Sequence, residues 1–136
     1  MVETTNAVVH RFEEAFAAND VAAIDELTDP NLIDHNPIPE QRPGRDGFKE
    51  TIALYKSVFP DMEVSDVQVI SEGDYAATRW KVSGTHQADF FGVPATGKRV
   101  TVEGMNFYRL EDGKITEVWT QFDGVAMMQQ LGAIPE

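Results

Sequence analysis

Apolar residues recur at helical spacing through the first part of the chain. The first such stripe consists of Val8, Phe12, Ala15 and Phe16. A second, shorter stripe of Val21, Ile24 and Leu27 follows Asp20, a residue type that caps helix N-termini, and ends at Asp29-Pro30. A third stripe, closed by Pro60, consists of Phe48, Ile52, Tyr55 and Val58. The pattern predicts three helices before any convincing strand.

From Met62 onward the apolar period changes to two, which is typical of strands. The clearest alternation places Ala76, Thr78, Trp80 and Val82 on one face. Segments 100–110 and 115–122 flank Asp112-Gly113, a strong signal for a two-residue hairpin turn. A last helix is expected from about 125 to 131, ending at Gly132. Because helices and strands occur in separate blocks, the chain predicts an α+β fold in which the helices cover one face of a curved antiparallel sheet.

The predicted hairpin also assigns residues to the two faces of the sheet. A regular two-residue loop puts Leu110 opposite Ile115. Moving away from the turn, every second pair of opposed residues then lies on the same face of the sheet as Leu110 and Ile115. The first face would carry Asn106, Tyr108, Trp119 and Asp123. The opposite face would carry Glu103, Met105, Phe107, Arg109, Val118 and Phe122. Both faces mix polar and bulky apolar residues, so we expect a polar-lined cavity on the first face and a homodimer interface on the second.

Length, charge and composition narrow the class of protein. With 136 residues, 42% of them hydrophobic, the chain fits one domain, residues 1–136, of the common size of about 100–150 residues. A net charge of −12 disfavours binding to nucleic acid or to anionic membranes. The absence of cysteine excludes disulfides, thiol nucleophiles and thiolate-bound metals. No apolar stretch approaches the ~18 residues that a membrane span needs, and we expect a cytoplasmic protein.

Several short motifs together resemble one known family. They are Asp34-His35-Asn36-Pro37, Phe59-Pro60-Asp61, Gly84-Thr85-His86, the run from Phe91 to Gly97, the run from Asp112 to Trp119 with Asp123, and Gln130-Leu131-Gly132. In this order they resemble the SnoaL-like polyketide cyclase, or ester cyclase, family of the nuclear transport factor two-like superfamily. The resemblance covers nearly the whole chain. It implies a cone-shaped α+β fold that encloses a deep pocket between helices and sheet.

Two residues are candidates for catalysis. Asp123 would lie beside aromatic surface at the end of the last strand, where loss of solvation raises the proton affinity of a carboxylate and suits a general base. The resemblance implies the same position for the acid/base aspartate of ring-closing members. The alternative is that Asp123 only caps the following helix. His35 lies beside Asp34, which could orient its imidazole; alternatively His35 merely packs while its neighbours form turns.

Further polar and aromatic residues are expected to bind a ligand in the pocket. They are Asn36, Trp80, His86, Asn106, Tyr108 and Trp119. For the aromatic residues the alternative is plain core packing, and for His86 it is a hydrogen-bonded core or surface histidine. No metal site is expected, because His10, His35 and His86 lack the spacing of a metal-binding motif. Nucleotide-binding glycine motifs and a nucleophilic serine elbow are also missing, so we expect no cofactor.

These groups fit aldol-type acid/base chemistry on a small apolar carbonyl compound. A carboxylate can remove a proton next to a carbonyl, and a shaped pocket can fold the substrate for carbon–carbon bond formation. A binding or dimerisation module without catalysis would keep the same pocket lining. A ketosteroid-isomerase-like enzyme is a second alternative. Ketosteroid isomerase resembles this scheme but needs a tyrosine on the first helix as the donor to the oxyanion. This chain has Phe12 and Phe16 on that helix, which disfavours the alternative.

Overall fold

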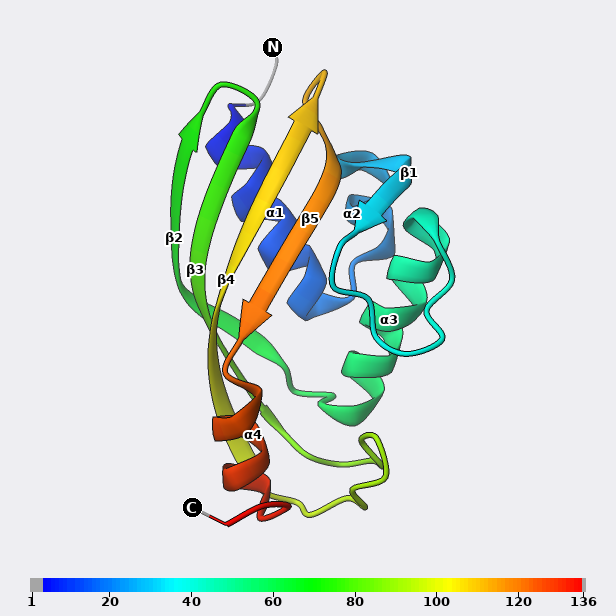
Figure 1. Cartoon of the computed structure of the whole chain (residues 1–136), viewed down its shortest axis with the longest axis vertical. Coiled ribbons are helices and arrows are strands. Elements are labelled where there is room, and N and C mark those ends of the chain that lie inside the picture. The colour runs from blue at the N-terminus through cyan, green and yellow to red at the C-terminus, as the bar shows by residue number, and fades with distance from the viewer. Residues whose placement is uncertain (1–3, 136) are drawn as a thin grey trace.

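The computed structural model describes residues 4–135 as a five-stranded sheet with three helices on one face and a fourth at its lower end (Figure 1). The elements, in chain order, are α1 (Thr5–Ala18), α2 (Val21–Leu27), β1 (Thr28–Asp34), α3 (Gly44–Val58), β2 (Glu63–Glu72), β3 (Tyr75–Thr85), β4 (Arg99–Glu111), β5 (Lys114–Phe122) and α4 (Gly124–Leu131). The α+β class with helices over one sheet face is therefore confirmed.

The helices begin and end where the sequence predicts caps. Thr4 accepts a hydrogen bond from the backbone N–H of Ala7 at the start of α1, and Asp20 does the same for Ala23 in α2. These side chains satisfy N–H groups that have no partner inside the helix. Asn19 ends α1 in the left-handed conformation, with φ of 52°. The helix start predicted at Asp20 is therefore confirmed, and it is a local property of the sequence.

The strand order is β1-β5-β4-β3-β2, and all pairs are antiparallel except β1 with β5, which is parallel. The prediction of an antiparallel sheet thus holds for β2 to β5, but β1 was not predicted. Asp29-Pro30 reads as a helix stop followed by a loop, yet Thr28–Asp34 forms a strand. Proline is tolerated there because β1 is an edge strand, where a missing N–H costs no ladder bond.

The β4–β5 hairpin confirms the predicted turn but not the predicted register. Asp112 and Gly113 both have positive φ, 50° and 76°, as a two-residue turn requires, and Leu110 pairs with Ile115 as expected. A β-bulge at Thr116 then shifts the pairing, so that Tyr108 lies opposite Val118 and not Glu117. The Thr116 hydroxyl donates to the carbonyl of Arg109 at 3.1 Å in this bulge. One extra residue exchanges the faces of everything beyond it.

The face assignment for β5 was therefore wrong beyond Ile115. Val118 points inward and is 1% exposed, and Phe122 lines the interior pocket, although both were expected on the outer face. Trp119 was expected inside, but it lies opposite Phe107 on the outer face. Met105 and Phe107 are on the outer face as predicted, 61% and 43% exposed. The physical reason is that the bulge lets Ile115 and Val118, three residues apart, both enter the core.

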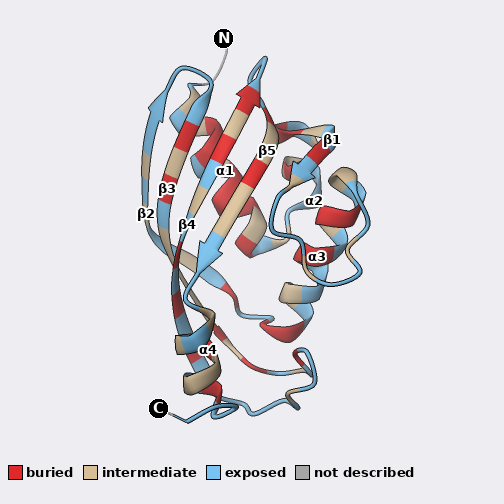
Figure 2. Ribbon diagram, viewed as in Figure 1, coloured by how far each residue is buried: buried red, intermediate tan, exposed pale blue. Residues whose placement is uncertain are grey.

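Two hydrophobic clusters fill the space between helices and sheet. The upper cluster includes Phe12, Ile52 and Tyr108, and the lower one includes Phe59, Phe90 and Met127. Phe16 packs against both clusters. Figure 2 shows buried positions alternating along the strands that face the helices. Trp119, predicted for the inner face of the sheet, belongs to neither cluster.

None of the helices within residues 4–135 has the length and apolar character that crossing a membrane requires.

Candidate functional site

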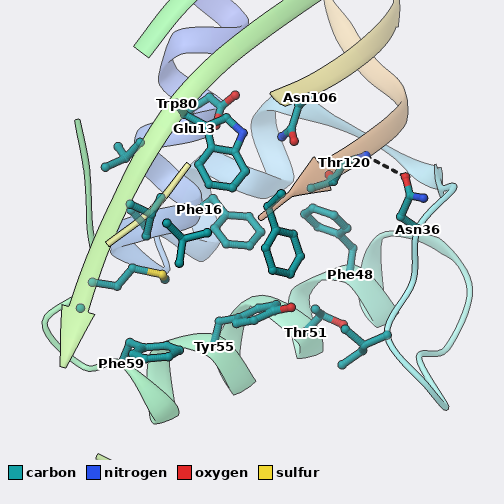
Figure 3. Close-up of a pocket in the computed structure, with 18 of the residues that line it drawn as sticks. Glu13, Phe16, Asn36, Phe48, Thr51, Tyr55, Phe59, Trp80, Asn106 and Thr120 are labelled. Atoms are coloured by element: carbon teal, nitrogen blue, oxygen red, sulfur yellow. Dashed lines mark hydrogen bonds between the residues drawn. The ribbon is translucent and has the colours of Figure 1, made fainter. Parts of the chain in front are cut away.

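A pocket opens between α1, α3 and the concave face of the sheet, with a cavity volume of about 180 Å³ (Figure 3). Its walls are aromatic and come from both layers: Phe12, Phe16, Phe48, Tyr55, Phe59 and Trp80. Polar side chains interrupt this surface at a few points: Glu13, Asp34, Asn36, Gln41, Thr51, Asn106 and Thr120. A largely apolar cavity with few polar groups is the usual character of a small-molecule site.

Glu13 is the one carboxylate among the buried residues of the described chain, at 7% exposure. Its Oε1 accepts hydrogen bonds from the Thr78 hydroxyl at 2.6 Å and the Tyr108 hydroxyl at 2.8 Å. Both donors stand on neighbouring strands of the sheet, whereas Glu13 comes from α1. Oε2 makes no hydrogen bond within residues 4–135, and the residue lines the pocket. The carboxylate is thus held at one oxygen and left open at the other.

Burial changes the proton affinity of this group. Loss of solvation raises the pKa of Glu13 above its ordinary value, although the hydrogen bonds from Thr78 and Tyr108 oppose the change. Burial and the nearby Glu13 carboxylate raise the pKa of Tyr108 well above its ordinary value, so its hydroxyl stays a donor. A carboxylate with raised pKa next to an apolar cavity is a better proton acceptor than one in water.

Asn106 and Trp80 stand on the same concave face of β3 and β4. The Asn106 amide Nδ2 donates to the Tyr108 hydroxyl at 2.6 Å. The Trp80 indole lies against Gly104, its cross-strand partner, and fills the place of a side chain there. Both residues line the pocket as predicted. Figure 3 shows them on the same side of the cavity as Glu13.

A second group of polar residues forms the rim between β1 and α3. The Asn36 side-chain carbonyl accepts from the backbone N–H of Thr120 at 2.8 Å, which ties the loop after β1 to β5. Gln41 donates to Asp34 Oδ2 at 3.0 Å and accepts from the Thr51 hydroxyl at 2.8 Å. Asn36 was expected in the pocket and lies there, but its carbonyl is occupied by the backbone.

Asp123 lies outside the pocket lining. It is exposed and caps α4, where its Oδ1 accepts from the backbone N–H of Ala126 at 2.9 Å. These contacts are those of the capping alternative, because the residue follows the last strand and turns directly into the helix. Its proposed role as a base remains a prediction that no contact in the structure supports.

His35 and Trp119 meet on the outer face of the sheet. Their rings stack with centroids 4.2 Å apart and 3° between planes. His35 Nε2 pairs with Glu117 Oε1 at 2.9 Å. Neither residue lines the pocket. The predicted grouping of Trp119 with Asn106 was wrong, because the bulge turns residues 117, 119 and 121 outward, and His35 stacks on Trp119 on that side.

His86 and Tyr108 are fully buried and neither lines the pocket. The Thr96 backbone N–H donates to His86 Nδ1 at 3.2 Å. The ring packs against Phe59, with centroids 5.9 Å apart. Tyr108 lies behind the pocket wall and reaches the cavity only through Glu13 and Asn106. It is therefore a supporting residue of the site rather than a wall of it.

The chain matches a known protein family over most of its length. The profile of the SnoaL-like polyketide cyclase family matches residues 6–131. The chain belongs to this family. It is 28% identical over 131 residues to the aklanonic acid methyl ester cyclase DnrD of Streptomyces peucetius, which covers 92% of this chain and 88% of that protein.

Solved structures are similar over nearly the full chain. TsrD from Streptomyces laurentii superposes with a TM-score of 0.86 at 26% identity, covering 95% of each chain. The candidate polyketide cyclase IdmH from Streptomyces antibioticus has a TM-score of 0.82 at 34% identity, covering 96% of this chain and 99% of its own. The family and the nuclear transport factor two-like fold expected from the motifs are confirmed.

Glu13 is the site residue of this SnoaL-like chain that the sequence analysis missed. It follows Phe12 directly and lies four residues after Val9, inside the buried arc of α1. A carboxylate surrounded by apolar neighbours at helical spacing was the available signal. Within residues 4–135, no three histidine or acidic side chains converge on a point where they could hold a metal ion.

The raised pKa of Glu13 predicts how stability depends on pH in this family member. As the pH rises past the ordinary glutamate pKa of 4.5, Glu13 loses its proton in the unfolded chain, whereas in the folded protein it keeps the proton to a higher pH. The folded state therefore binds more protons, and its stability falls as pH rises toward the raised pKa. Glu13→Gln removes this penalty, so its melting temperature should exceed that of wild type by an amount that grows with pH from 4.5 and then levels off. Calorimetry from pH 4 to 9 measures the difference, and a constant difference contradicts the prediction.

Proposed function

We propose that the protein is an acid/base catalyst of aldol-type bond formation in a small polyketide-like molecule. Glu13 removes the proton from the carbon next to a carbonyl group and later gives that proton to the new alkoxide. The observation that carries the proposal is the Glu13 carboxylate itself. It is buried at an aromatic cavity, fixed through Oε1 by two hydroxyl donors and open at Oε2. Such preorganisation lowers the cost of proton transfer in a site closed to water.

The reaction balances with this one group. Glu13 takes the proton from the carbon next to the carbonyl, and the electron pair of that C–H bond forms the enolate. The enolate carbon attacks a second carbonyl carbon of the same molecule, which forms the new carbon–carbon bond. The resulting alkoxide recovers the proton from the Glu13 carboxyl group. The apolar walls favour the step by holding the two reacting carbons close together.

Asp123 and His35, the catalytic residues predicted from the sequence, are not the proton acceptor in this proposal. Both lie outside the pocket lining, and Asp123 is engaged with the first turn of α4. Glu13 is favoured because it borders the cavity directly. The ketosteroid-isomerase-like alternative would need a hydroxyl donor on α1. The pocket residues of that helix are Phe12, Glu13, Phe16 and Ala17, and none of them carries a hydroxyl group.

Deuterium exchange tests the proposal without knowledge of the natural substrate. In D₂O, wild-type protein should speed the exchange of the methyl protons of 2-acetylnaphthalene above the buffer rate, as followed by proton NMR. The relative from Streptomyces peucetius is named for aklanonic acid methyl ester, so ring closure of that ester is the second assay. If neither reaction is accelerated while aryl ketones raise the melting temperature, a non-catalytic binding module replaces this proposal.

The second candidate, a binding module, is favoured by the chemistry of the sheet side of the pocket. Asn106 pairs with Thr120 across β4 and β5, and both line the cavity. These are neutral groups suited to holding a ligand, and they offer no second titratable group beside Glu13. The exchange assay separates the two functions, because binding alone does not move a proton from carbon.

We also propose that the protein forms a homodimer through the outer face of its sheet. A row of rings crosses that face: Tyr75 on Phe107 at 5.4 Å, Phe107 on Trp119 at 5.6 Å, and Trp119 on His35. Tyr75 and Phe107 are 44% and 43% exposed, and Met105 beside them is 61% exposed. Exposed aromatic rows of this kind are typical of interfaces between subunits.

The cytoplasmic location expected from the sequence also stays a prediction.

Light scattering at micromolar concentration should give about twice the chain mass of 15.1 kDa for wild type. Phe107→Glu should return the monomer mass, because it places a charge in the centre of the aromatic row. Val125→Glu is the matched control, since Val125 is 61% exposed and lies on α4, outside the strands that carry the aromatic row. A monomer mass for wild type contradicts the proposal.

A further inference from the structure

Two residues that line the pocket each carry a polar atom without a hydrogen-bond partner in residues 4–135. The indole N–H of Trp80 and the amide oxygen Oδ1 of Asn106 are both shielded from solvent, and neither is bonded within the described chain. Buried polar groups in folded proteins are nearly always paired, because an unpaired one loses its bond to water without replacement. One is a donor that cannot accept, and the other is an acceptor that cannot donate. A ligand with one acceptor and one donor would satisfy both atoms.

The amide of Asn106 is held in this orientation by its neighbours. Its Nδ2 donates to the Tyr108 hydroxyl at 2.6 Å, and the single hydroxyl proton of Tyr108 goes to Glu13 at 2.8 Å. If the amide turned over, Oδ1 would face a hydroxyl that has no proton left to give. The chain of bonds therefore keeps Nδ2 toward Tyr108 and leaves Oδ1 as the free acceptor.

The Trp80 indole is also fixed in place. Trp80 pairs with Gly104 across β3 and β4, and a Cβ atom at position 104 would lie 2.3 Å from Trp80 Cζ2. The glycine thus makes room for the ring to lie flat against β4. Asn106 is two residues farther along the same strand, on the same face, so the two free groups are diagonal neighbours over the cavity.

We propose that Trp80 Nε1 and Asn106 Oδ1 select a flat aromatic ligand that carries both a ketone and a hydroxyl group. The ketone oxygen accepts from the Trp80 indole, and the hydroxyl donates to Asn106. An aromatic ligand is favoured because packed rings form the walls: Phe12 and Phe48 lie 5.8 Å apart, and Phe16 lies 6.0 Å from Phe48 and 6.2 Å from Tyr55. This inference rests on the proposed function in one respect, since the Trp80 N–H would stabilise the enolate oxygen formed when Glu13 removes the proton.

Calorimetric binding of a set of naphthalenes of nearly equal size tests the two roles separately. In wild type, 6-acetyl-2-naphthol should bind at least ~10-fold more tightly than its methyl ether, which keeps the ketone but has no proton to give Asn106. It should also bind at least ~10-fold more tightly than 6-ethyl-2-naphthol, which has no ketone for Trp80. The 7-acetyl isomer repeats the comparison with a shorter spacing between the two groups.

Variants assign each preference to one residue. Asn106→Leu should bring the naphthol and its methyl ether within ~2-fold of each other and leave the ketone preference intact. Trp80→Phe should remove the ketone preference and leave the hydroxyl preference. Glu13→Gln should keep both preferences, because neither depends on proton transfer.

Equal affinities across the ligand set in wild type overturn the inference, as does the absence of binding by every member of it. These comparisons need no variant, so a variant that fails to fold leaves the test intact. Failure of the deuterium exchange, in contrast, overturns the proposed function while both ligand preferences can still be measured.

Discussion

Glu13→Gln should lower the deuterium exchange of 2-acetylnaphthalene at least ~100-fold, the usual cost of losing a general base. Glutamine keeps the length of the side chain, and its carbonyl oxygen can still accept from Thr78 and Tyr108. Only the ability to take a proton is lost. Because the substitution also removes a charge that is costly to bury, we expect the variant to be as stable as wild type or more so. Loss of activity would therefore not reflect loss of fold.

Glu14→Gln is the matched control for this variant. Glu14 is the next residue on α1, is exposed, and pairs with His10 at 3.2 Å on the solvent side of the helix. It should exchange at the wild-type rate. Asp123→Asn should also stay within ~3-fold of wild type in the same assay, because asparagine caps a helix about as well as aspartate. If Asp123→Asn loses activity and Glu13→Gln does not, the base is Asp123 and the assignment of Glu13 is wrong.

Gly47→Ala should destabilise the protein by roughly 3 kcal/mol, the cost of forcing extra atoms into a closely packed place. A Cβ atom at Gly47 would lie 1.6 Å from the backbone carbonyl oxygen of Arg42. Helix propensity alone predicts the opposite sign, because alanine is favoured over glycine by about 1 kcal/mol inside a helix. The loop that holds Arg42 also carries Gln41 and Asn36 at the pocket rim, so ligand affinity should fall together with stability.

Gly124→Ala provides the comparison for Gly47→Ala. Its added Cβ atom would have Phe122 at 3.6 Å, an ordinary contact, so this variant should be within ~0.5 kcal/mol of wild type. Chemical denaturation followed by circular dichroism measures both variants. A Gly47→Ala variant as stable as wild type would contradict the prediction.

Much of the fold could be predicted because its signals are local. Asp20 begins a helix and Asp112-Gly113 forms a turn for reasons contained in a few neighbouring residues. The alternation of Ala76, Thr78 and Trp80 places the inner face of β3 correctly. Strand β1 was missed because its pairing partner β5 lies more than 80 residues away in the sequence, and nothing within Thr28–Asp34 records that contact.

The candidate site was predicted in part. Trp80, Asn106 and Asn36 lie at the pocket, since each follows from the regular alternation of β3 and β4 or from the loop after β1. Trp119 was misplaced because of the bulge at Thr116. His35, in the loop after β1, stacks on Trp119 and does not line the pocket. The spacing of Ile115 and Val118, three residues rather than two, was the sequence feature that a regular hairpin could not satisfy.

The sequence by itself determined the helices, the hairpin turn, the α+β class and the family, because periodicity, caps and turn residues act over short distances. The tertiary structure decided which side of β5 faces the pocket, since one bulged residue reverses every side chain beyond it. It also decided that Glu13, an ordinary helix residue in the sequence, is buried beside Thr78 and Tyr108. Those contacts join α1 to strands 65 and 95 residues away, and only packing brings such groups together.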